Sequence, residues 1–271
     1  MKELNGRELA GFVKERQAHH VRSLRGNKIF PKLLIIRDSD NPVITKYVNL
    51  KKQYGEDIGV EVIDKKVSTI DEACDAVRSA NADETISGMI VQLPLLDKAR
   101  TDEVVNSIVP DKDVDGLSQV TKNEERVFES ATAMAINWLL AGHDIDLKNR
   151  KIALVGRGRL VGAPLERMWR NSNLDVTVFR HDSDLSELKN YDLIVSATGV
   201  PHLIKSEMIQ SSAVVVDAGT ASEGGVLVGD VDDAVRERSD LLAITPRIGG
   251  VGPLTVSVLF EDVIAAAQRK K

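Results

Sequence analysis

The chain is poor in cysteine, with Cys74 alone among 271 residues. A single cysteine excludes an internal disulfide, which fits a reducing compartment, so we expect a cytoplasmic protein. Residues 1–5 lack the apolar core of a signal peptide. No uninterrupted apolar run approaches the roughly 18 residues that cross a bilayer, and we therefore expect no membrane partner.

An excess of basic residues is also missing. The chain has 36 Lys and Arg against 41 Asp and Glu, for a formal net charge of −5. Because nucleic-acid-binding proteins carry a basic face, we predict no nucleic-acid partner. The five histidines show no metal-ligand spacing. Residues 111–116 suggest a calcium loop, but Lys122 stands where the loop needs a bidentate glutamate, so we predict no metal site.

Strands and helices alternate along both halves of the chain. Apolar strands spaced by helices are typical of parallel sheets with helices on both faces. The sequence therefore predicts an α/β fold of two α/β domains, the second a Rossmann-type parallel sheet, with a cleft between them. The predicted domains are 1–118 with 256–271, and 119–255. Strands are predicted at 32–36, 60–63, 88–93, 152–155, 176–179, 193–196, 214–217 and 242–244, and helices at 9–24, 43–57, 70–80, 101–108, 131–141 and 255–269.

A glycine-rich turn follows the predicted strand 152–155. Gly156, Gly158 and Gly162 form a GxGxxxG pattern that leads into a helix. Glycines let a backbone approach a phosphate closely, and the helix start offers free N–H groups to it. A plain strand-to-helix turn is the alternative, but the position between strand and helix favours dinucleotide binding.

Basic side chains near this turn indicate the type of dinucleotide. Arg157 lies inside the turn, and Arg180 and His181 end the next predicted strand. Arginines accept the 2′-phosphate of NADP, whereas an acid would bind the ribose hydroxyl of NAD. The arginines favour NADP, although Asp182 speaks for NAD and simple exposure of both arginines is the alternative.

Several polar residues of the first half form a second candidate site. Tyr47 and Lys51 lie four residues apart and so share one helix face, where they could stack on and protonate a flat heterocycle. Gln92 ends a predicted strand, where ligands gather in α/β sheets. A loop carboxylate of residues 111–116 could bind an amine or amidine. An ordinary surface pair and a satisfied strand-end amide are the alternatives.

A second glycine-rich loop spans residues 245–255, with Gly249, Gly250 and Gly252 close together. So many glycines imply close approach of the backbone to a ligand or to another chain segment. We expect ligand contact here.

Six segments of the chain stand out as motifs. They are YVNLK at 47–51, GMIVQLPL at 88–95, PDKDVDG at 110–116, GRGRLVGAP at 156–164, GDV at 229–231 and TPRIGGVGPLT at 245–255. Taken in this order, they resemble the bifunctional methylenetetrahydrofolate dehydrogenase/cyclohydrolase family over nearly the whole chain. Any one segment could match by chance, but six in order are specific.

The resemblance implies oxidation of 5,10-methylene-tetrahydrofolate with NADP and hydrolysis of the methenyl product to 10-formyl-tetrahydrofolate, in one-carbon metabolism that serves purine biosynthesis. Lys51 would be the catalytic lysine, Gln92 would hydrogen-bond Lys51 and tune it, Tyr47 would stack on folate and Asp115 would anchor the pterin. A homodimer through the cofactor domains is also implied. The implied folate contacts include Leu93, Gly249, Gly250 and Pro253, and the implied cofactor contacts are Gly156, Arg157, Gly158, Val161, Gly162, Arg180, His181, Thr198 and Gly199.

The chain departs from the family pattern in four places. Residues 130–135 keep only Thr132 of the PCTPxG segment, Gly158 replaces a serine, Arg180 and His181 replace His-Ser, and residues 247–248 replace Val-Pro. We therefore expect altered cofactor preference or dehydrogenase rate rather than altered folate binding. The alternatives are a non-catalytic or cyclohydrolase-only member, and another two-domain NADP-dependent dehydrogenase of shikimate or amino-acid type.

Overall fold

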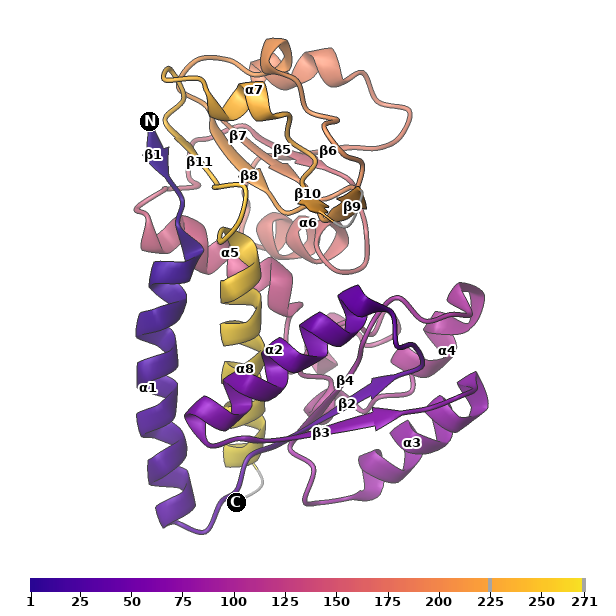
Figure 1. The fold of residues 1–271 in the computed structure, drawn as a ribbon. Helices are drawn as coiled ribbons and strands as arrows, with labels where there is room; N and C mark the ends of the chain where they lie inside the picture. Colours follow the sequence, from indigo (N-terminus) through magenta and orange to yellow (C-terminus); the bar gives the residue numbers. More distant parts are fainter. Residues whose placement is uncertain (224–225, 270–271) are drawn as a thin grey trace. The chain divides into compact units, whose positions relative to one another are not determined.

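The computed structural model describes residues 1–223 and 226–269 (Figure 1). The chain forms two compact units, which we name by their sheets. The six-stranded unit comprises Met1–Ala10 and Thr132–Thr255, and the three-stranded unit comprises Gly11–Ala131 and Val256–Lys271. The predicted α/β class with two domains is confirmed.

The sheet of the three-stranded unit has the order β3-β2-β4, and all its strands are parallel. Its strands are apolar where they face helices: Ile36, Met89 and Val91 pack with Ala73 and Val77 in one buried cluster. The elements are β2 (Lys32–Arg37), α2 (Pro42–Ile58), β3 (Glu61–Lys66), α3 (Ile70–Ala82), β4 (Gly88–Val91) and α4 (Thr101–Val105).

The sheet of the six-stranded unit has the order β1-β11-β8-β7-β5-β6, also parallel throughout. Its central strands are fully buried, as expected for a sheet with helices on both faces. The elements are β1 (Lys2–Glu3), α5 (Ala131–Gly142), β5 (Ile152–Val155), α6 (Gly162–Asn171), β6 (Val176–Phe179), β7 (Leu193–Ser196), β8 (Val214–Asp217), β9 (Ala221–Glu223), β10 (Val226–Val228), α7 (Asp233–Arg236) and β11 (Ala243–Ile244).

Two long helices, α1 (Gly6–Gly26) and α8 (Val251–Arg269), contribute residues to both units. By length and composition α8 could cross a membrane, the one such helix among residues 1–223 and 226–269. However, 56% of its apolar stretch is buried within the fold, as in the core helix of a globular protein. Glu261 and Asp262 also interrupt the stretch.

Local signals explain where α2 begins and ends. The Asn41 side chain accepts a hydrogen bond from the backbone N–H of Val43 at 2.9 Å, and Pro42 occupies the first turn. Gly59 ends the helix in the left-handed region, with φ of 86°, which glycine adopts without steric cost. The helix that carries Tyr47 and Lys51 is therefore bounded by its own sequence.

The structure also contains the short helix α7, which was not predicted, and α4 and β4 end two to three residues earlier than predicted. Three further differences concern the domains, the strand pairs and the last helix. The predicted division placed residues 1–10 with the first half, but β1 pairs with β11 and so belongs to the six-stranded unit, as do residues from Thr132 rather than 119 onward. The antiparallel pair β9 and β10 was not predicted. The last helix begins at Val251 rather than at 255, so the second glycine-rich loop is shorter than expected.

Candidate functional site

Lys51 and Gln92 meet within the three-stranded unit. Lys51 lies on α2, and its Nζ donates a hydrogen bond to Oε1 of Gln92 at 2.8 Å. Gln92 directly follows β4, and its backbone N–H donates to the carbonyl of Ile36 at 2.8 Å. The pairing with β2 therefore fixes the backbone of Gln92, and the Gln92 side chain in turn fixes the amine of Lys51. The expected contact between these two residues is confirmed.

Asp115 belongs to a loop that is anchored on both sides. Before it, the buried Lys112 donates from Nζ to the carbonyls of Ala80, Asn81 and Asp83 at 2.6–2.9 Å. After it, Gly116 has φ of 62°, and a Cβ there would lie 2.4 Å from the carbonyl carbon of Glu129. Such close approach requires glycine, and the loop carboxylate is thereby fixed in place.

Electrostatics couple these side chains. Burial lowers the pKa of Lys51, while the negative charge of Asp115 opposes that shift. Burial raises the pKa of Asp115 to about 6, while Lys51 lowers it and Asp113 raises it. A lysine that loses its proton more readily than usual beside an acid that titrates near neutrality is suited to proton transfer.

Tyr47 lies one helical turn before Lys51. Its ring is partly buried, and burial raises the pKa of its hydroxyl. Leu93 follows Gln92 and packs against the apolar cluster of the sheet. The structure thus brings Tyr47, Lys51, Gln92, Leu93 and Asp115 into one unit. Within it, Lys51 is linked to Gln92 by a hydrogen bond and to Asp115 by electrostatics.

Asp262 is a carboxyl group in this unit that sequence analysis missed. It lies on α8, partly buried among apolar neighbours. Burial, together with the negative charges of Glu261 and Asp115, raises the pKa of Asp262 to about 8, and Arg269 opposes the shift. The sequence signal for this residue was the adjacent pair of acids Glu261 and Asp262 within an otherwise apolar helix. The apolar pattern of the helix alone indicates only that the helix belongs to the core.

The first glycine-rich turn lies in the six-stranded unit between β5 and α6. Gly156 has φ of 94°, and a Cβ there would lie 2.8 Å from the carbonyl oxygen of Ala197. A Cβ on Gly162 would lie 2.1 Å from the carbonyl oxygen of Gly156. A side chain at either of these two positions would clash with backbone atoms, whereas a Cβ on Gly158 would meet no atom within 4 Å. This cradle at the N-terminus of α6, a ten-residue helix, fits a dinucleotide pyrophosphate.

The predicted basic residues take different positions around this turn. Nε of Arg157 donates to the Glu166 carboxylate at 2.5 Å. Arg180 and His181 are exposed directly after β6. Val161 is buried before the helix begins. Thus Arg157 is not simply exposed: it is paired with a carboxylate on α6.

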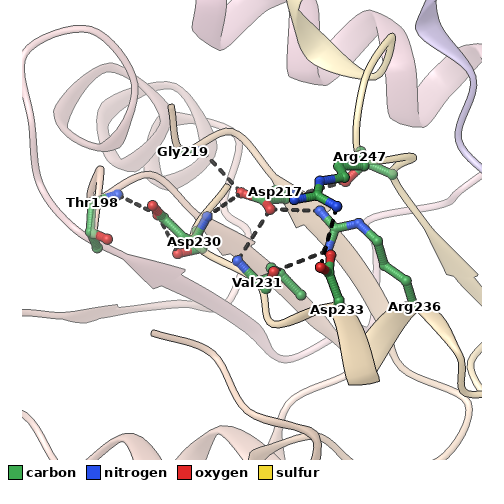
Figure 2. A network of polar contacts seen from close by, with 10 residues as sticks. Thr198, Asp217, Gly219, Asp230, Val231, Asp233, Arg236 and Arg247 are labelled. Atoms are coloured by element: carbon green, nitrogen blue, oxygen red, sulfur yellow. Dashed lines mark hydrogen bonds and ion pairs between the residues drawn. The ribbon is translucent and has the colours of Figure 1, made fainter. Parts of the chain in front are cut away.

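Two buried carboxylates hold the loops that follow β7 and β8 (Figure 2). Oδ2 of Asp230 accepts hydrogen bonds from Ser196 Oγ at 2.7 Å and from the backbone N–H of Thr198 at 2.6 Å. Asp217 accepts from the backbone N–H groups of Asp230 and Val231 and from Arg236 at 2.7–3.1 Å. The predicted cofactor residues Thr198 and Gly199 thus lie on a loop that Asp230 fixes, and sequence analysis did not predict this support.

The second glycine-rich loop approaches another chain segment, which was one of the two expected explanations for its glycines. The carbonyl of Gly249 accepts hydrogen bonds from the backbone N–H groups of Gly6 and Arg7 at 2.9 and 3.0 Å. A Cβ on Gly6 would lie 1.9 Å from the carbonyl oxygen of Gly250. Pro253 lies within the first turn of α8. The φ of Gly249, 98°, favours glycine at that position without a ligand, whereas a Cβ on Gly252 would meet no atom within 4 Å.

Comparison with known proteins identifies the family. Residues 4–115 match the catalytic domain of tetrahydrofolate dehydrogenase/cyclohydrolase, and residues 130–271 match the NAD(P)-binding domain of the same family. The chain belongs to the tetrahydrofolate dehydrogenase/cyclohydrolase family.

Individual relatives cover the chain from end to end. The bifunctional protein FolD of Lactobacillus helveticus is 36% identical, over 99% of this chain and 98% of that protein. The crystal structure of the bifunctional FolD of Campylobacter jejuni has a TM-score of 0.92 at 30% identity and covers 100% of both chains. The Trypanosoma brucei FolD, solved with NADP cofactor and an inhibitor, has a TM-score of 0.89 at 28% identity and covers 98% of this chain and 96% of that one.

Family membership assigns both activities to this chain. It is an NADP-dependent oxidoreductase that converts 5,10-methylene-tetrahydrofolate to 5,10-methenyl-tetrahydrofolate, and a hydrolase that converts the methenyl compound to 10-formyl-tetrahydrofolate. A shikimate- or amino-acid-type dehydrogenase and a non-catalytic member are not favoured.

The partly buried carboxyl of Asp262 predicts a pH-dependent stability difference. A raised pKa means that the folded state binds this proton more tightly than the unfolded state does. The contribution of Asp262 to wild-type stability therefore falls as pH rises from about 4 to about 8, because burial penalises ionisation of this carboxyl in the fold. In Asp262→Asn that penalty is absent. We expect its free energy of unfolding relative to wild type to grow by about 1–3 kcal/mol between pH 5 and pH 8.

Urea unfolding of both proteins at the two pH values measures this difference. Asp111→Asn is the matched control, since Asp111 is an exposed carboxyl of the same unit. The difference in unfolding free energy between Asp111→Asn and wild type should be the same at both pH values. A difference between Asp262→Asn and wild type that stays constant with pH would contradict the assignment.

Proposed function

We propose that Lys51, Gln92, Asp115 and Tyr47 form the catalytic and folate-binding centre for both reactions. The hydrogen bond from Lys51 Nζ to Gln92 Oε1 is the observation that carries the proposal. It fixes an amine whose pKa is lowered by burial, within electrostatic reach of a buried acid. If Tyr47 and Lys51 were an ordinary surface pair, Lys51 would have neither a fixed hydrogen-bond partner nor a shifted pKa.

In the cyclohydrolase step, the oxygen of a water molecule bonds to the methenyl carbon. The bond from that carbon to N5 then breaks, which leaves the formyl group on N10. N5 takes up one proton, and one proton is released to solution. Lys51 holds and moves the proton at its Nζ, while the Gln92 amide orients that nitrogen and keeps it from rotating away.

In the dehydrogenase step, the oxidised nicotinamide, when bound, accepts the hydride that leaves the bridging methylene carbon. The glycine turn at Gly156 and Gly162 would hold the pyrophosphate, with Val161, Thr198 and Gly199 as further neighbours. Arg157, Arg180 and His181 would face the adenosine 2′-phosphate. The open backbone at the turn and the basic side chains after β5 and β6 support this assignment.

Asp115 is proposed to anchor the pterin ring through its amino and ring N–H groups, and Tyr47 to stack on the ring. Burial raises the pKa of Asp115 to about 6. An ionised carboxylate accepts hydrogen bonds from such groups best, so folate binding through Asp115 should weaken as pH falls below about 6. Gly249, Gly250 and Pro253 remain proposed folate contacts, although the structure gives the two glycines another role.

We further propose that the protein acts in the cytoplasm, in one-carbon supply for purine biosynthesis, as a homodimer through its six-stranded units. The family resemblance supports these assignments. Light scattering on the purified protein measures the oligomeric state directly, and a monomer at micromolar concentration would contradict the dimer.

Replacement of Lys51 tests the proposed centre. Lys51→Met keeps the length of the side chain but removes the amine. We expect the rate of methenyl-tetrahydrofolate hydrolysis to fall by at least about 100-fold, the usual contribution of a positioned proton-transfer group. The measurement is the decay of methenyl absorbance, corrected for the spontaneous rate.

The neighbouring Lys52 provides the control. It is exposed on the same helix, and no hydrogen bond or ion pair of its side chain occurs within residues 1–223 and 226–269. Lys52→Met should hydrolyse the substrate at the wild-type rate. Wild-type hydrolysis by Lys51→Met would overturn the proposal.

The replacement of the family serine by Gly158 leads to a test of the cofactor side. A Cβ at Gly158 meets no atom within 4 Å, so Gly158→Ser should fold with an unchanged melting temperature. A hydroxyl next to Arg157 adds one donor for the cofactor. We expect the KM for NADP to fall by about two- to tenfold, as one added hydrogen bond allows, with little change in the KM for folate.

Gly162→Ser is the matched control, because its Cβ would lie 2.1 Å from the carbonyl oxygen of Gly156. That variant should lose both stability and NADP binding. An unchanged or higher KM for NADP in Gly158→Ser would show that the departure at position 158 does not limit cofactor binding.

A further inference from the structure

Glu166 forms an ion pair with Arg157, one of the predicted cofactor residues. It lies on the second turn of α6, and its side chain is 15% exposed. One carboxylate oxygen accepts from Nε of Arg157 at 2.5 Å, and the other lies 3.3 Å from Nη2 of Arg170, one helical turn further along. The carboxylate therefore bridges the glycine turn and the helix.

The contact uses only one edge of the Arg157 guanidinium. Its Nε is engaged, whereas neither Nη1 nor Nη2 has a partner among the described residues. Half of the Arg157 side chain is exposed. A guanidinium with both terminal nitrogens free presents the fork that binds a phosphate through two parallel hydrogen bonds.

Strand pairing places a second basic residue, Arg180, at the same edge of the sheet as Arg157. β5 and β6 are parallel, with Val155 opposite Phe179, and the backbone N–H of Gly156 donates to the carbonyl of Phe179 at 2.9 Å. Arg157 and Arg180 each follow closely after these paired residues. Adjacent carboxyl ends of strands are where the adenosine end of a dinucleotide binds in such sheets.

A carboxylate beside a phosphate-binding arginine can act in two opposite ways. It can reduce the positive charge that attracts the phosphate, or it can hold the guanidinium in the binding orientation before the ligand arrives. Arg170 contacts the same carboxylate, so the three side chains together keep a net charge of +1 (two arginines and one glutamate). The charge of the group thus stays positive, which favours orientation as the main effect.

We propose that Glu166 is a positioning residue that holds Arg157 through Nε and leaves Nη1 and Nη2 free for the 2′-phosphate of NADP. It thereby favours NADP over NAD. This inference rests on the assignment of NADP as the cofactor and names a specificity-determining residue within its site.

Binding of two small probes tests the proposal without turnover. Adenosine 2′,5′-bisphosphate carries the 2′-phosphate, whereas adenosine 5′-monophosphate lacks it. Isothermal titration of each probe against wild type, Glu166→Gln and Glu166→Ala compares a retained acceptor with a lost one. Glutamine keeps an oxygen for Nε but removes the charge, and alanine removes both.

We expect Glu166→Ala to bind the bisphosphate about three- to tenfold more weakly than wild type, the cost of ordering one long side chain. Glu166→Gln should stay within about twofold, and the monophosphate should bind all three proteins alike. In an Arg157→Ala background, Glu166→Ala should cause no further loss. Glu207→Ala removes an exposed carboxylate of the same unit and should match wild type.

Two results would overturn the proposal, and they differ in meaning. If wild type prefers the bisphosphate, but Glu166→Ala binds the bisphosphate at least as tightly as wild type does, Glu166 does not position Arg157. If wild type binds the two probes equally, the NADP assignment itself fails, and the role of Glu166 fails with it. Circular dichroism and melting temperature confirm that each variant is folded.

Discussion

The removal of one ammonium group from water organises the chemistry of the three-stranded unit. Lys51 sits where burial disfavours its charge, so it needs both a hydrogen-bond acceptor and a nearby negative charge. Gln92 supplies the acceptor, and Asp115 supplies the charge. The loop that carries Asp115 is anchored on both sides, by the hydrogen bonds of Lys112 and by the close backbone approach at Gly116. The loop, the strand end and the helix therefore serve a single amine.

The six-stranded unit uses buried charge differently. The carboxylates of Asp217 and Asp230 accept hydrogen bonds from backbone N–H groups of loop residues. They thus satisfy backbone donors that have no partner strand. Gly219 and Gly229 lie so close to them that a Cβ would meet carboxylate oxygens at 1.9 and 2.0 Å. The loop of the proposed cofactor contacts Thr198 and Gly199 is thereby tied to the buried carboxylate of Asp230 (Figure 2).

Much of this arrangement could be predicted from the sequence, because periodicity and strand-end polar residues report local structure. The strands from Ile152 to Asp217 and the helix that carries Lys51 appear where the pattern predicts them. Features that depend on distant partners could not be predicted. β1 has two residues and no pattern of its own, Glu166 resembles any exposed helical acid, and the raised pKa of Asp262 depends on which carboxylates the fold places near it.

The pairing of β1 with β11 joins two segments that lie far apart in the sequence, since Lys2 lies opposite Ala243. During synthesis, β1 cannot pair until β11 has been made about 240 residues later in the chain. Until then the sheet lacks both strands on that side, and β8 remains an open edge. The six-stranded unit therefore cannot complete its sheet while its C-terminal portion is still in the ribosome, whereas β2, β3 and β4 are joined within residues 32–91 and can pair early.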